Sequence, residues 1–372
     1  MVDSEDSGYG LSDVGESNAI DAPEYEYLPA MPKSYRPKIG IVGCGGISEY
    51  HLRAYRTLAL EVVALCDVNA AAAEARRNEF YPDAEIYTDF HDLIAREDIE
   101  VVDATTHPPE RIPIVEAALS SGKHVLSQKP FVMDLDEGER LVNLAEEHER
   151  ILAVNQNGRW ASHFSYMRHA VGAGLIGKVS GVNFSLQWDH SWVAGTPFDD
   201  LRHLILMDFG VHWFDMCAVF FDGRDPTSVS ANVSDVPNQR TKAPMLAHVI
   251  VAYPEGQATM SFNGHVMHGQ KDETIVTGDL GTLCSTGPSL SEQGVTVFTE
   301  AGHARPELQG TWFDNGFQGA MTELLCAIKE KRAPHHSARN NLRSLELCLA
   351  ALASAEDGGR PKVPGEHRVA TL

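Results

Sequence analysis

Apolar and polar residues follow one pattern up to about residue 155 and a different pattern after residue 160. In the first part, short apolar runs typical of buried strands are separated by segments with helical periodicity. The expected strands are 38–43, 61–66, 84–87, 100–105, 123–127 and 151–155, and the expected helices are 47–57, 69–79, 89–96, 109–121 and 134–149. Because successive parallel strands need long crossovers, this alternation predicts a doubly wound parallel sheet.

In the second part, strand-like segments follow one another with only Gly, Pro and Asp turns between them. The expected helices are 162–173, 207–221, 314–331 and 337–356, and the expected strands are 178–188, 228–236, 246–253, 257–263, 272–277, 281–285 and 294–298. Such runs of strands are typical of antiparallel sheets. The expected fold class is therefore α/β, with a doubly wound parallel sheet over 35–158 and an α/β domain with an open, mainly antiparallel sheet over 159–372.

The segment 1–34 lacks periodic apolar positions, and residues 1–32 carry eight acids and no Lys or Arg. This composition predicts a disordered or loosely docked acidic arm. Tyr25, Tyr27, Leu28 and Met31 are the residues that could hold its end against the body or against a neighbouring subunit.

The net charge of −22 argues against a nucleic acid or an anionic membrane as partner. No apolar run reaches the roughly 20 residues that span a bilayer, and no signal peptide is recognisable, so a cytoplasmic location is expected. The six cysteines are scattered without a CxxC pair, which favours reduced thiols over disulfides or zinc ligands.

A glycine-rich turn, Gly43-Cys44-Gly45-Gly46-Ile47-Ser48, follows the first expected strand, and Asp67 ends the second. Gly43 allows a tight turn, Gly45 allows close approach of the backbone to a pyrophosphate, and the following helix offers its N-terminus to an anion. A carboxylate at Asp67 can accept the hydroxyls of an adenosine ribose and would repel a 2′-phosphate. The combination predicts NAD in preference to NADP.

Ligands of doubly wound sheets bind at the carboxyl ends of the strands, where further polar residues follow the expected strands. The expected cofactor-binding residues are Gly43, Cys44, Gly45, Gly46, Ile47, Asp67, Thr105, His107, Gln128, Lys129 and Gln156. Lys129 directly follows a strand in Ser127-Gln128-Lys129-Pro130 and is expected near the nicotinamide. A cis bond before Pro130 would fix its direction. The alternative is a surface lysine in a strand-to-helix turn.

Asp208, His212 and Asp215 lie at i, i+4 and i+7, which would place them on one helix face. A carboxylate beside an imidazole can raise its pKa and orient it, which suits proton removal from a hydroxyl. The alternative is a surface His–Asp pair, but the flanking residues are apolar. No HxxxH or HExxH spacing is present, and no metal is expected.

Aromatic and polar residues cluster in two further segments, and their mixture is typical of carbohydrate binding. They supply the remaining expected substrate ligands, Arg159, Trp160, Trp188 and His190, beside Lys129, Asp208 and His212. The alternative is a core tryptophan cluster with surface polar residues.

Together these residues resemble the glucose-fructose oxidoreductase / inositol dehydrogenase / MocA (Gfo/Idh/MocA) family from about residue 36 to residue 356. The resemblance rests on the turn 43–48, Asp67, GKHVLSQKP (122–130), NQNGRW (155–160), DFGVHWFD (208–215) and GFQGAMTELLCAI (316–328). It implies a Rossmann domain, then a domain that binds substrate and forms oligomers, so a homodimer or homotetramer is expected.

The resemblance also implies roles for single residues. Lys129 corresponds to the family lysine that hydrogen-bonds the substrate hydroxyl, and Asp208 and His212 to its partners, with His212 as general acid/base. The family motif usually reads Glu-Lys-Pro, and in this chain Gln128 replaces the glutamate.

The expected function is that of an NAD-dependent dehydrogenase or reductase acting on a secondary hydroxyl or keto carbon of a sugar, cyclitol or sugar derivative. One alternative is a glycoside-cleaving enzyme that retains NAD and oxidises its substrate transiently. Another is a non-catalytic NAD-sensing protein, against which the complete Lys129, Asp208 and His212 set argues.

Overall fold

The first sheet of the computed structural model, which describes residues 17–221 and 223–370, has six parallel strands in the order β3-β2-β1-β4-β5-β6. Its strands are β1 (Lys38–Val42), β2 (Glu61–Cys66), β3 (Glu85–Tyr87), β4 (Ile99–Ala104), β5 (His124–Ser127) and β6 (Leu152–Val154). The strand order reverses between β1 and β4, so the expected doubly wound sheet is confirmed. Ligands of such sheets bind at this reversal.

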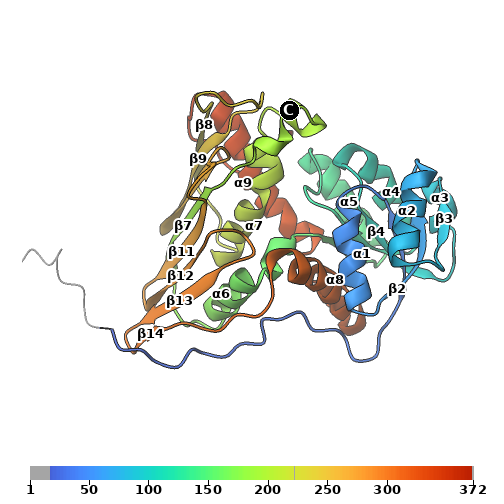
Figure 1. Ribbon diagram of the computed structural model, residues 1–372, viewed down its shortest axis with the longest axis horizontal. Helices are drawn as coiled ribbons and strands as arrows, with labels where there is room; N and C mark the ends of the chain where they lie inside the picture. Colours follow the sequence, from blue (N-terminus) through green and yellow to red (C-terminus); the bar gives the residue numbers. More distant parts are fainter. Residues whose placement is uncertain (1–16, 222, 371–372) are drawn as a thin grey trace, which may run out of the picture.

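Helices cover both faces of this sheet (Figure 1). The crossover helices are α1 (Ser48–Thr57), α2 (Ala70–Phe80), α3 (Phe90–Ile94), α4 (Pro108–Ser120) and α5 (Leu135–Glu147). Two helices from the end of the chain add to them: α8 (Trp312–Glu330) packs against α1, and α9 (Ala338–Glu356) packs against α5. Phe317 and Met321 of α8 share an apolar cluster with Ile39 and Leu52. The segment 159–372 therefore also completes the core of the first domain.

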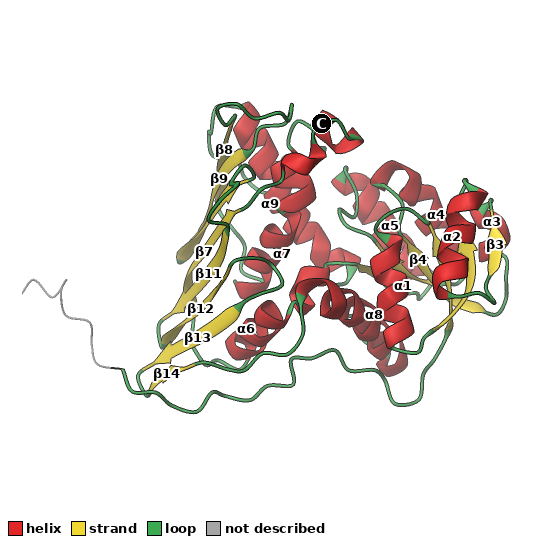
Figure 2. Ribbon diagram, viewed as in Figure 1, coloured by secondary structure: helices red, strands yellow, loops and turns green. Residues whose placement is uncertain are grey.

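The second sheet has eight strands in the order β14-β13-β12-β11-β7-β10-β9-β8. Its strands are β7 (Val179–Gln187), β8 (Ser228–Ser234), β9 (Leu246–Tyr253), β10 (Gly256–Asn263), β11 (Lys271–Gly278), β12 (Gly281–Gly287), β13 (Gly294–Thr299) and β14 (Gly302–Ala304). All pairs are antiparallel except β7 with β10, so the mainly antiparallel sheet is confirmed. One face is covered by α6 (Ser162–Gly172), α7 (Val211–Phe220) and α9 (Figure 2).

The helix expected over 207–221 is interrupted. A π-helical turn (Ile205–Phe209) precedes α7, and the Gly210 N–H donates to the Ile205 carbonyl at 2.7 Å, a bond five residues back. Three short 3₁₀ turns precede this π-helical turn in the sequence, at Asn157–Trp160, Ser191–Val193 and Pro197–Asp200. Within the described ranges, no helix has both the length and the apolar character to cross a bilayer.

The described end of the acidic arm, residues 17–35, contacts both domains, and we call this segment the strap. It starts beside β14, where Ala19 forms a bridge with His303, and runs along the molecule to β1 (Figure 1). The Tyr166 hydroxyl donates to the Pro23 carbonyl at 2.8 Å, and Tyr25 packs edge-on against the Tyr166 ring. Tyr25, Tyr27 and Met31 pack against the body, as expected for the end of the arm, while residues 1–16 lie outside the described residues.

Candidate active site

The glycine-rich turn at the end of β1 has the shape that a pyrophosphate requires. Gly43 has φ +105°, and a Cβ atom there would lie 2.9 Å from the Thr105 Oγ1, so only glycine fits. The Thr105 hydroxyl donates to the Gly43 carbonyl at 2.6 Å and thereby holds the turn. Gly45 and Gly46 have no atoms within 4 Å of an added Cβ, so their backbone faces open space at the start of α1. These glycines fit a dinucleotide.

Asp67 is fixed at the end of β2 by two backbone donors. Its Oδ2 accepts from the Cys44 N–H at 2.7 Å, and its Oδ1 accepts from the Asn69 N–H at 2.8 Å. The half-buried carboxylate is thus tied to the glycine-rich turn, in the position that suits a ribose diol. Ile47 lies at the cap of α1, and His107 is exposed at the cap of α4.

Lys129 joins the two domains. It follows β5, its peptide bond to Pro130 is cis, and its Nζ donates to the Asp208 Oδ1 at 3.1 Å and to the Asp208 carbonyl at 2.9 Å. The Lys129 and Asp208 side chains are 17% and 27% exposed, so this ion pair remains open to a ligand. The structure therefore brings together two of the three expected catalytic residues.

His212 lies on α7, close enough to Lys129 for the ammonium charge to act on it, but its environment differs from the one expected. Its Nδ1 is buried and has no hydrogen-bond partner among the described residues. Burial, and then the Lys129 ammonium, lower the pKa of His212 well below its usual value. The expectation that a carboxylate raises this pKa is wrong, because Asp208 pairs with Lys129 and Asp215 pairs with Arg159. His212 is a neutral imidazole at neutral pH.

Arg159 and Trp160 are corrected as substrate ligands, because both are buried inside the protein. The Arg159 Nε and Nη2 donate to the two Asp215 carboxylate oxygens at 2.6 Å each, and its Nη1 donates to the His335 carbonyl at 2.6 Å. The Trp160 ring packs against Gly319, where an added Cβ would lie 2.0 Å from it. Trp160 matches the alternative of a core tryptophan cluster, whereas Arg159 is a buried structural residue and not the surface polar residue of that alternative.

Trp188 and His190 form an aromatic wall with Phe209, the residue after Asp208. The Phe209 ring centroid lies 4.4 Å from that of Trp188 and 4.0 Å from that of His190. They line a small hollow together with Leu186, Ile205, Phe262, Asn263 and Gly264. Burial lowers the pKa of His190 to about 4. Its Nδ1 accepts from the Trp192 indole N–H at 3.0 Å, so the neutral ring carries its proton on Nε2.

Gln128 is corrected as a cofactor ligand, because its buried side chain is committed to protein partners. Its Oε1 accepts from the Lys129 N–H at 2.6 Å, and its Nε2 lies 3.2 Å from the His51 Nε2. Gln156 differs: its amide is buried, and neither amide atom has a partner among the described residues. An amide in this state suits a ligand, so Gln156 remains a candidate.

Arg111 is a supporting residue that the sequence pattern does not single out. Its buried guanidinium donates to the carbonyls of Gln128 and Pro130, and to the Phe131 carbonyl at 3.3 Å. It also donates to the Thr106 carbonyl at 3.1 Å. The turn that carries Lys129 is thereby bound to the start of α4. A helix-surface arginine would show the same sequence pattern, so only the fold reveals this role.

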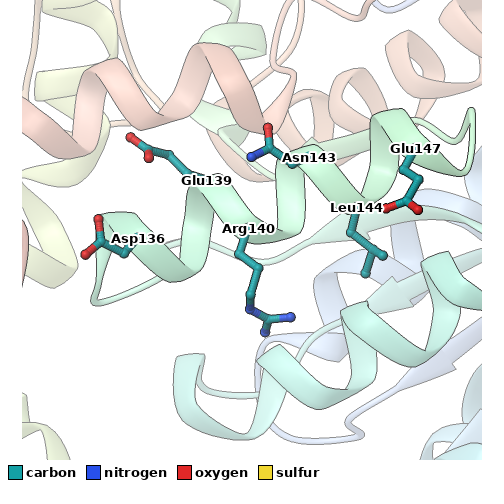
Figure 3. A pocket seen from close by; sticks show the side chains of 6 residues that line it. All are labelled: Asp136, Glu139, Arg140, Asn143, Leu144 and Glu147. Carbon is teal, nitrogen blue, oxygen red and sulfur yellow. The ribbon is translucent and has the colours of Figure 1, made fainter.

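A second hollow of the described surface lies away from the site. This hollow of about 410 Å³ lies along α5, lined by Asp136, Glu139, Arg140, Asn143, Leu144 and Glu147 (Figure 3). Three of its charged side chains pair with neighbouring elements: Arg140 with Glu116 of α4 at 3.0 Å, and Asp136 and Glu139 with Arg368. Within residues 17–221 and 223–370, no group of three His, Cys, Asp or Glu side chains is arranged to hold a metal ion.

Comparisons with known proteins identify relatives of both domains. The model of an oxidoreductase family with an NAD-binding Rossmann fold matches residues 37–156, and that of the GFO/IDH/MocA C-terminal domain matches residues 164–284. D-apiose dehydrogenase of Paraburkholderia graminis is 25% identical over 338 residues, which cover 87% of this chain and 88% of that protein. Inositol 2-dehydrogenase of Rhizobium meliloti is 24% identical over 330 residues, covering 86% and 97%.

A solved oxidoreductase from Agrobacterium radiobacter, in complex with NAD+, L-tartaric acid and magnesium, has the same fold. It superposes with a TM-score of 0.79 at 20% sequence identity, covering 89% of this chain and 99% of that one. The likeness therefore extends over both domains.

Proposed function

Because the chain belongs to the Gfo/Idh/MocA family of NAD-binding oxidoreductases, we propose that it moves a hydride between NAD and a secondary hydroxyl or keto carbon of a sugar, cyclitol or sugar derivative. The observation that carries the proposal is the Lys129–Asp208 ion pair at the carboxyl end of β5. Its ammonium charge acts on His212, whose buried Nδ1 has no partner among the described residues. The relatives named as D-apiose and inositol dehydrogenases support the substrate class.

In an alcohol oxidation, Lys129 binds the substrate oxygen and His212 transfers the proton. Bound NAD+ supplies the acceptor for the hydride that leaves the substrate carbon. The Lys129 ammonium, held by Asp208, donates a hydrogen bond to the substrate oxygen and stabilises negative charge that develops there. His212 is neutral and can take the hydroxyl proton as the C=O bond forms. In the reverse direction, protonated His212 returns that proton.

The aromatic wall and its polar groups suit a polyhydroxylated ring. Trp188 and Phe209 offer flat apolar surfaces, and the His190 Nε2–H is a fixed donor for a hydroxyl. The unpartnered amide of Gln156 can both donate and accept.

Single substitutions in a steady-state assay test these roles. Lys129→Met and His212→Gln should each lower kcat by about 10² to 10⁴-fold, because each removes a group that acts on the reacting oxygen. Lys329→Met and His91→Gln, at exposed positions of α8 and α3, are the matched controls and should keep wild-type turnover. Wild-type turnover of both site variants would refute the assignment.

The glycoside-cleaving alternative receives no support from the comparisons, whose named relatives are dehydrogenases. The two reactions differ in cofactor balance. A dehydrogenase accumulates NADH as it consumes substrate, whereas transient oxidation returns the hydride and accumulates none.

A homodimer or homotetramer assembled through the uncovered face of the eight-stranded sheet completes the proposal. That face carries Ile250, 50% exposed, and Phe298, 43% exposed, on strands near its two edges. Ile250→Arg should shift the mass measured by light scattering towards the monomer, while Leu280→Arg, at a turn outside this face, should not. A monomeric wild-type protein would contradict this part.

A further inference from the structure

A buried network of hydrogen-bonded polar side chains contacts the backbone of Lys129 and has no role in the proposed chemistry. It contains His51 of α1, Asp103 of β4, Gln128 and Asn155, all of which are buried. The His51 Nδ1 lies 2.7 Å from the Asp103 Oδ2, and the His51 Nε2 lies 3.2 Å from both the Gln128 and the Asn155 amide nitrogens. A network of this kind costs free energy unless each member has a defined partner.

The orientation of the Gln128 amide follows from the backbone of Lys129. A backbone N–H can only donate, and the Lys129 N–H points to the Gln128 Oε1 at 2.6 Å. That atom is therefore the carbonyl oxygen, and the amide nitrogen must face His51. The Asn155 Nδ2 lies 3.4 Å from the same oxygen, which orients the Asn155 amide in the same way.

The two amide nitrogens in turn fix the proton of His51. Both are donors, so the His51 Nε2 between them must accept and cannot carry a proton. The Nδ1 then carries the proton and donates to the Asp103 Oδ2, which also accepts from the Tyr55 hydroxyl at 2.5 Å. The imidazole is neutral and is held in a single tautomer.

We propose that Gln128 is a positioning residue, whose amide holds the Lys129 backbone with its oxygen and holds His51 in the neutral Nδ1–H form with its nitrogen. The Lys129 role in this statement rests on the proposed function, whereas the His51 tautomer does not. Arg111 clamps the same turn through its carbonyls, so Gln128 and Arg111 bind the two sides of one peptide segment.

This arrangement explains why an amide and a carboxylate are not equivalent at position 128. A glutamate could still accept from the Lys129 N–H with one oxygen. Its other oxygen would face the His51 Nε2, and two acceptor atoms cannot share a hydrogen bond without a proton. Gln128→Glu should therefore bind one additional proton, on His51, and turn it into an imidazolium.

Nitrogen NMR of the full-length protein with labelled histidine tests the tautomer directly. The His51 resonances can be assigned by contacts to the Phe317 ring, whose centroid lies 4.7 Å away. The wild-type spectrum should show a protonated Nδ1 and an unprotonated Nε2, and Gln128→Glu should show both nitrogens protonated. Gln257→Glu, which adds the same charge at an exposed position, should leave the His51 signals unchanged.

Kinetics test the effect on Lys129. Gln128→Leu removes both amide contacts and should lower kcat by about 10²-fold, with a smaller effect on the KM for NAD. Gln128→Glu keeps the acceptor for the Lys129 N–H and should restore most of the lost turnover.

The outcomes separate this proposal from the proposed function. A protonated Nε2 in the wild type, or wild-type kcat in a folded Gln128→Leu variant, would overturn the role of Gln128 while Lys129→Met remained inactive. If Gln128→Leu does not fold, the wild-type and Gln128→Glu spectra still decide. Full turnover of Lys129→Met would instead overturn the proposed function and leave the tautomer intact.

Discussion

The ion pairs Arg159–Asp215 and Lys129–Asp208 have different roles, and the exposure of their side chains distinguishes them. Arg159 and Asp215 are 3% and 2% exposed, and each charge is satisfied by protein groups. Ser344 donates to Asp215 at 2.8 Å, and Arg159 also donates to Asn340 at 2.7 Å. Lys129 and Asp208 keep more exposure, so they can exchange partners with a ligand.

Asp215→Ala should therefore destabilise the protein without removing a substrate contact. The Arg159 guanidinium would stay buried without a counter-ion, at a cost of about 3–5 kcal/mol in the free energy of unfolding. Denaturant unfolding measures this loss, and the folded fraction should keep the wild-type KM. Glu116→Ala, which breaks the exposed pair with Arg140, should cost less than about 1 kcal/mol. A small loss for Asp215→Ala together with a large rise in KM would contradict a structural role.

Asp272 of β11 gives the protein a pH-dependent stability. It is buried, its Oδ2 has no partner among the described residues, and burial raises its pKa to about 7. The folded protein keeps this proton in a pH range where the unfolded chain has lost it. Its contribution to stability is therefore complete below about pH 4 and is lost as the pH rises to about 7.

Asp272→Asn removes this dependence and should stabilise the protein increasingly from pH 4 to pH 7. The gain at pH 8 should approach about 4 kcal/mol, the free energy of a pKa displaced from 3.8 to about 7. Unfolding curves at pH 5 and pH 8 measure it, with exposed Asp83→Asn as control. Equal stability of wild type and Asp272→Asn at pH 8 would contradict this account.

At the scale of elements, the π-helical turn before α7 sets the geometry of the site. Its Gly210 N–H to Ile205 carbonyl hydrogen bond spans five residues and interrupts the regular helix expected through Asp208 and His212. π-Helical turns are frequent at functional sites. Gly210 ends the turn, and an added Cβ would lie 2.7 Å from the Leu206 carbonyl oxygen.

Gly210→Ala adds only one methyl group but should disturb the active site. The backbone oxygen cannot move without altering the turn, so Asp208 should shift relative to Lys129, and kcat should fall by at least about tenfold. Gly172→Ala, at the end of α6 where an added Cβ meets nothing within 4 Å, is the control. Unchanged kcat for Gly210→Ala would show that the turn geometry is not needed.

The sequence predicts regular elements well and their irregularities poorly. The strands and helices of both sheets, except the three-residue edge strand β14, are expected near their observed bounds, because their periodicity reflects burial on one or both faces. Lys129 and Asp208 meet as the family resemblance implies. The π-helical turn keeps the apolar composition of a helix, so periodicity does not reveal it. The partners of Arg159 and Gln128 are distant in the sequence, so only the fold shows that these residues are buried.

At the scale of the whole molecule, the strap connects the two domains. Near its start it pairs with His303, and the Tyr27 hydroxyl accepts from the Gln309 N–H at 2.7 Å. Near its end Met31 packs against the apolar cluster of the first domain, and the Tyr35 hydroxyl donates to Glu100 at 3.2 Å. Acidic composition predicts a loose segment, and the tyrosines and Met31 expected to hold its end provide the contacts that dock it.

Removing residues 1–33 should lower the free energy of unfolding by at least about 2 kcal/mol relative to a chain that lacks only residues 1–16. The difference between the two truncations reports on the strap, because both lack the first sixteen residues. Denaturant unfolding measures it, and hydrogen exchange of β14 and β1 should increase in the shorter chain. Identical stability of the two chains would show that the observed contacts add nothing.

The central claim is that this chain oxidises a carbon bearing a secondary hydroxyl and leaves the hydride on NAD. The most direct measurement incubates the purified protein with NAD+ and a panel of sugars, cyclitols and sugar acids, and records NADH absorbance against substrate consumed. We predict one NADH for each substrate oxidised, and loss of the signal in Lys129→Met. Substrate consumption without accumulation of NADH would contradict the claim.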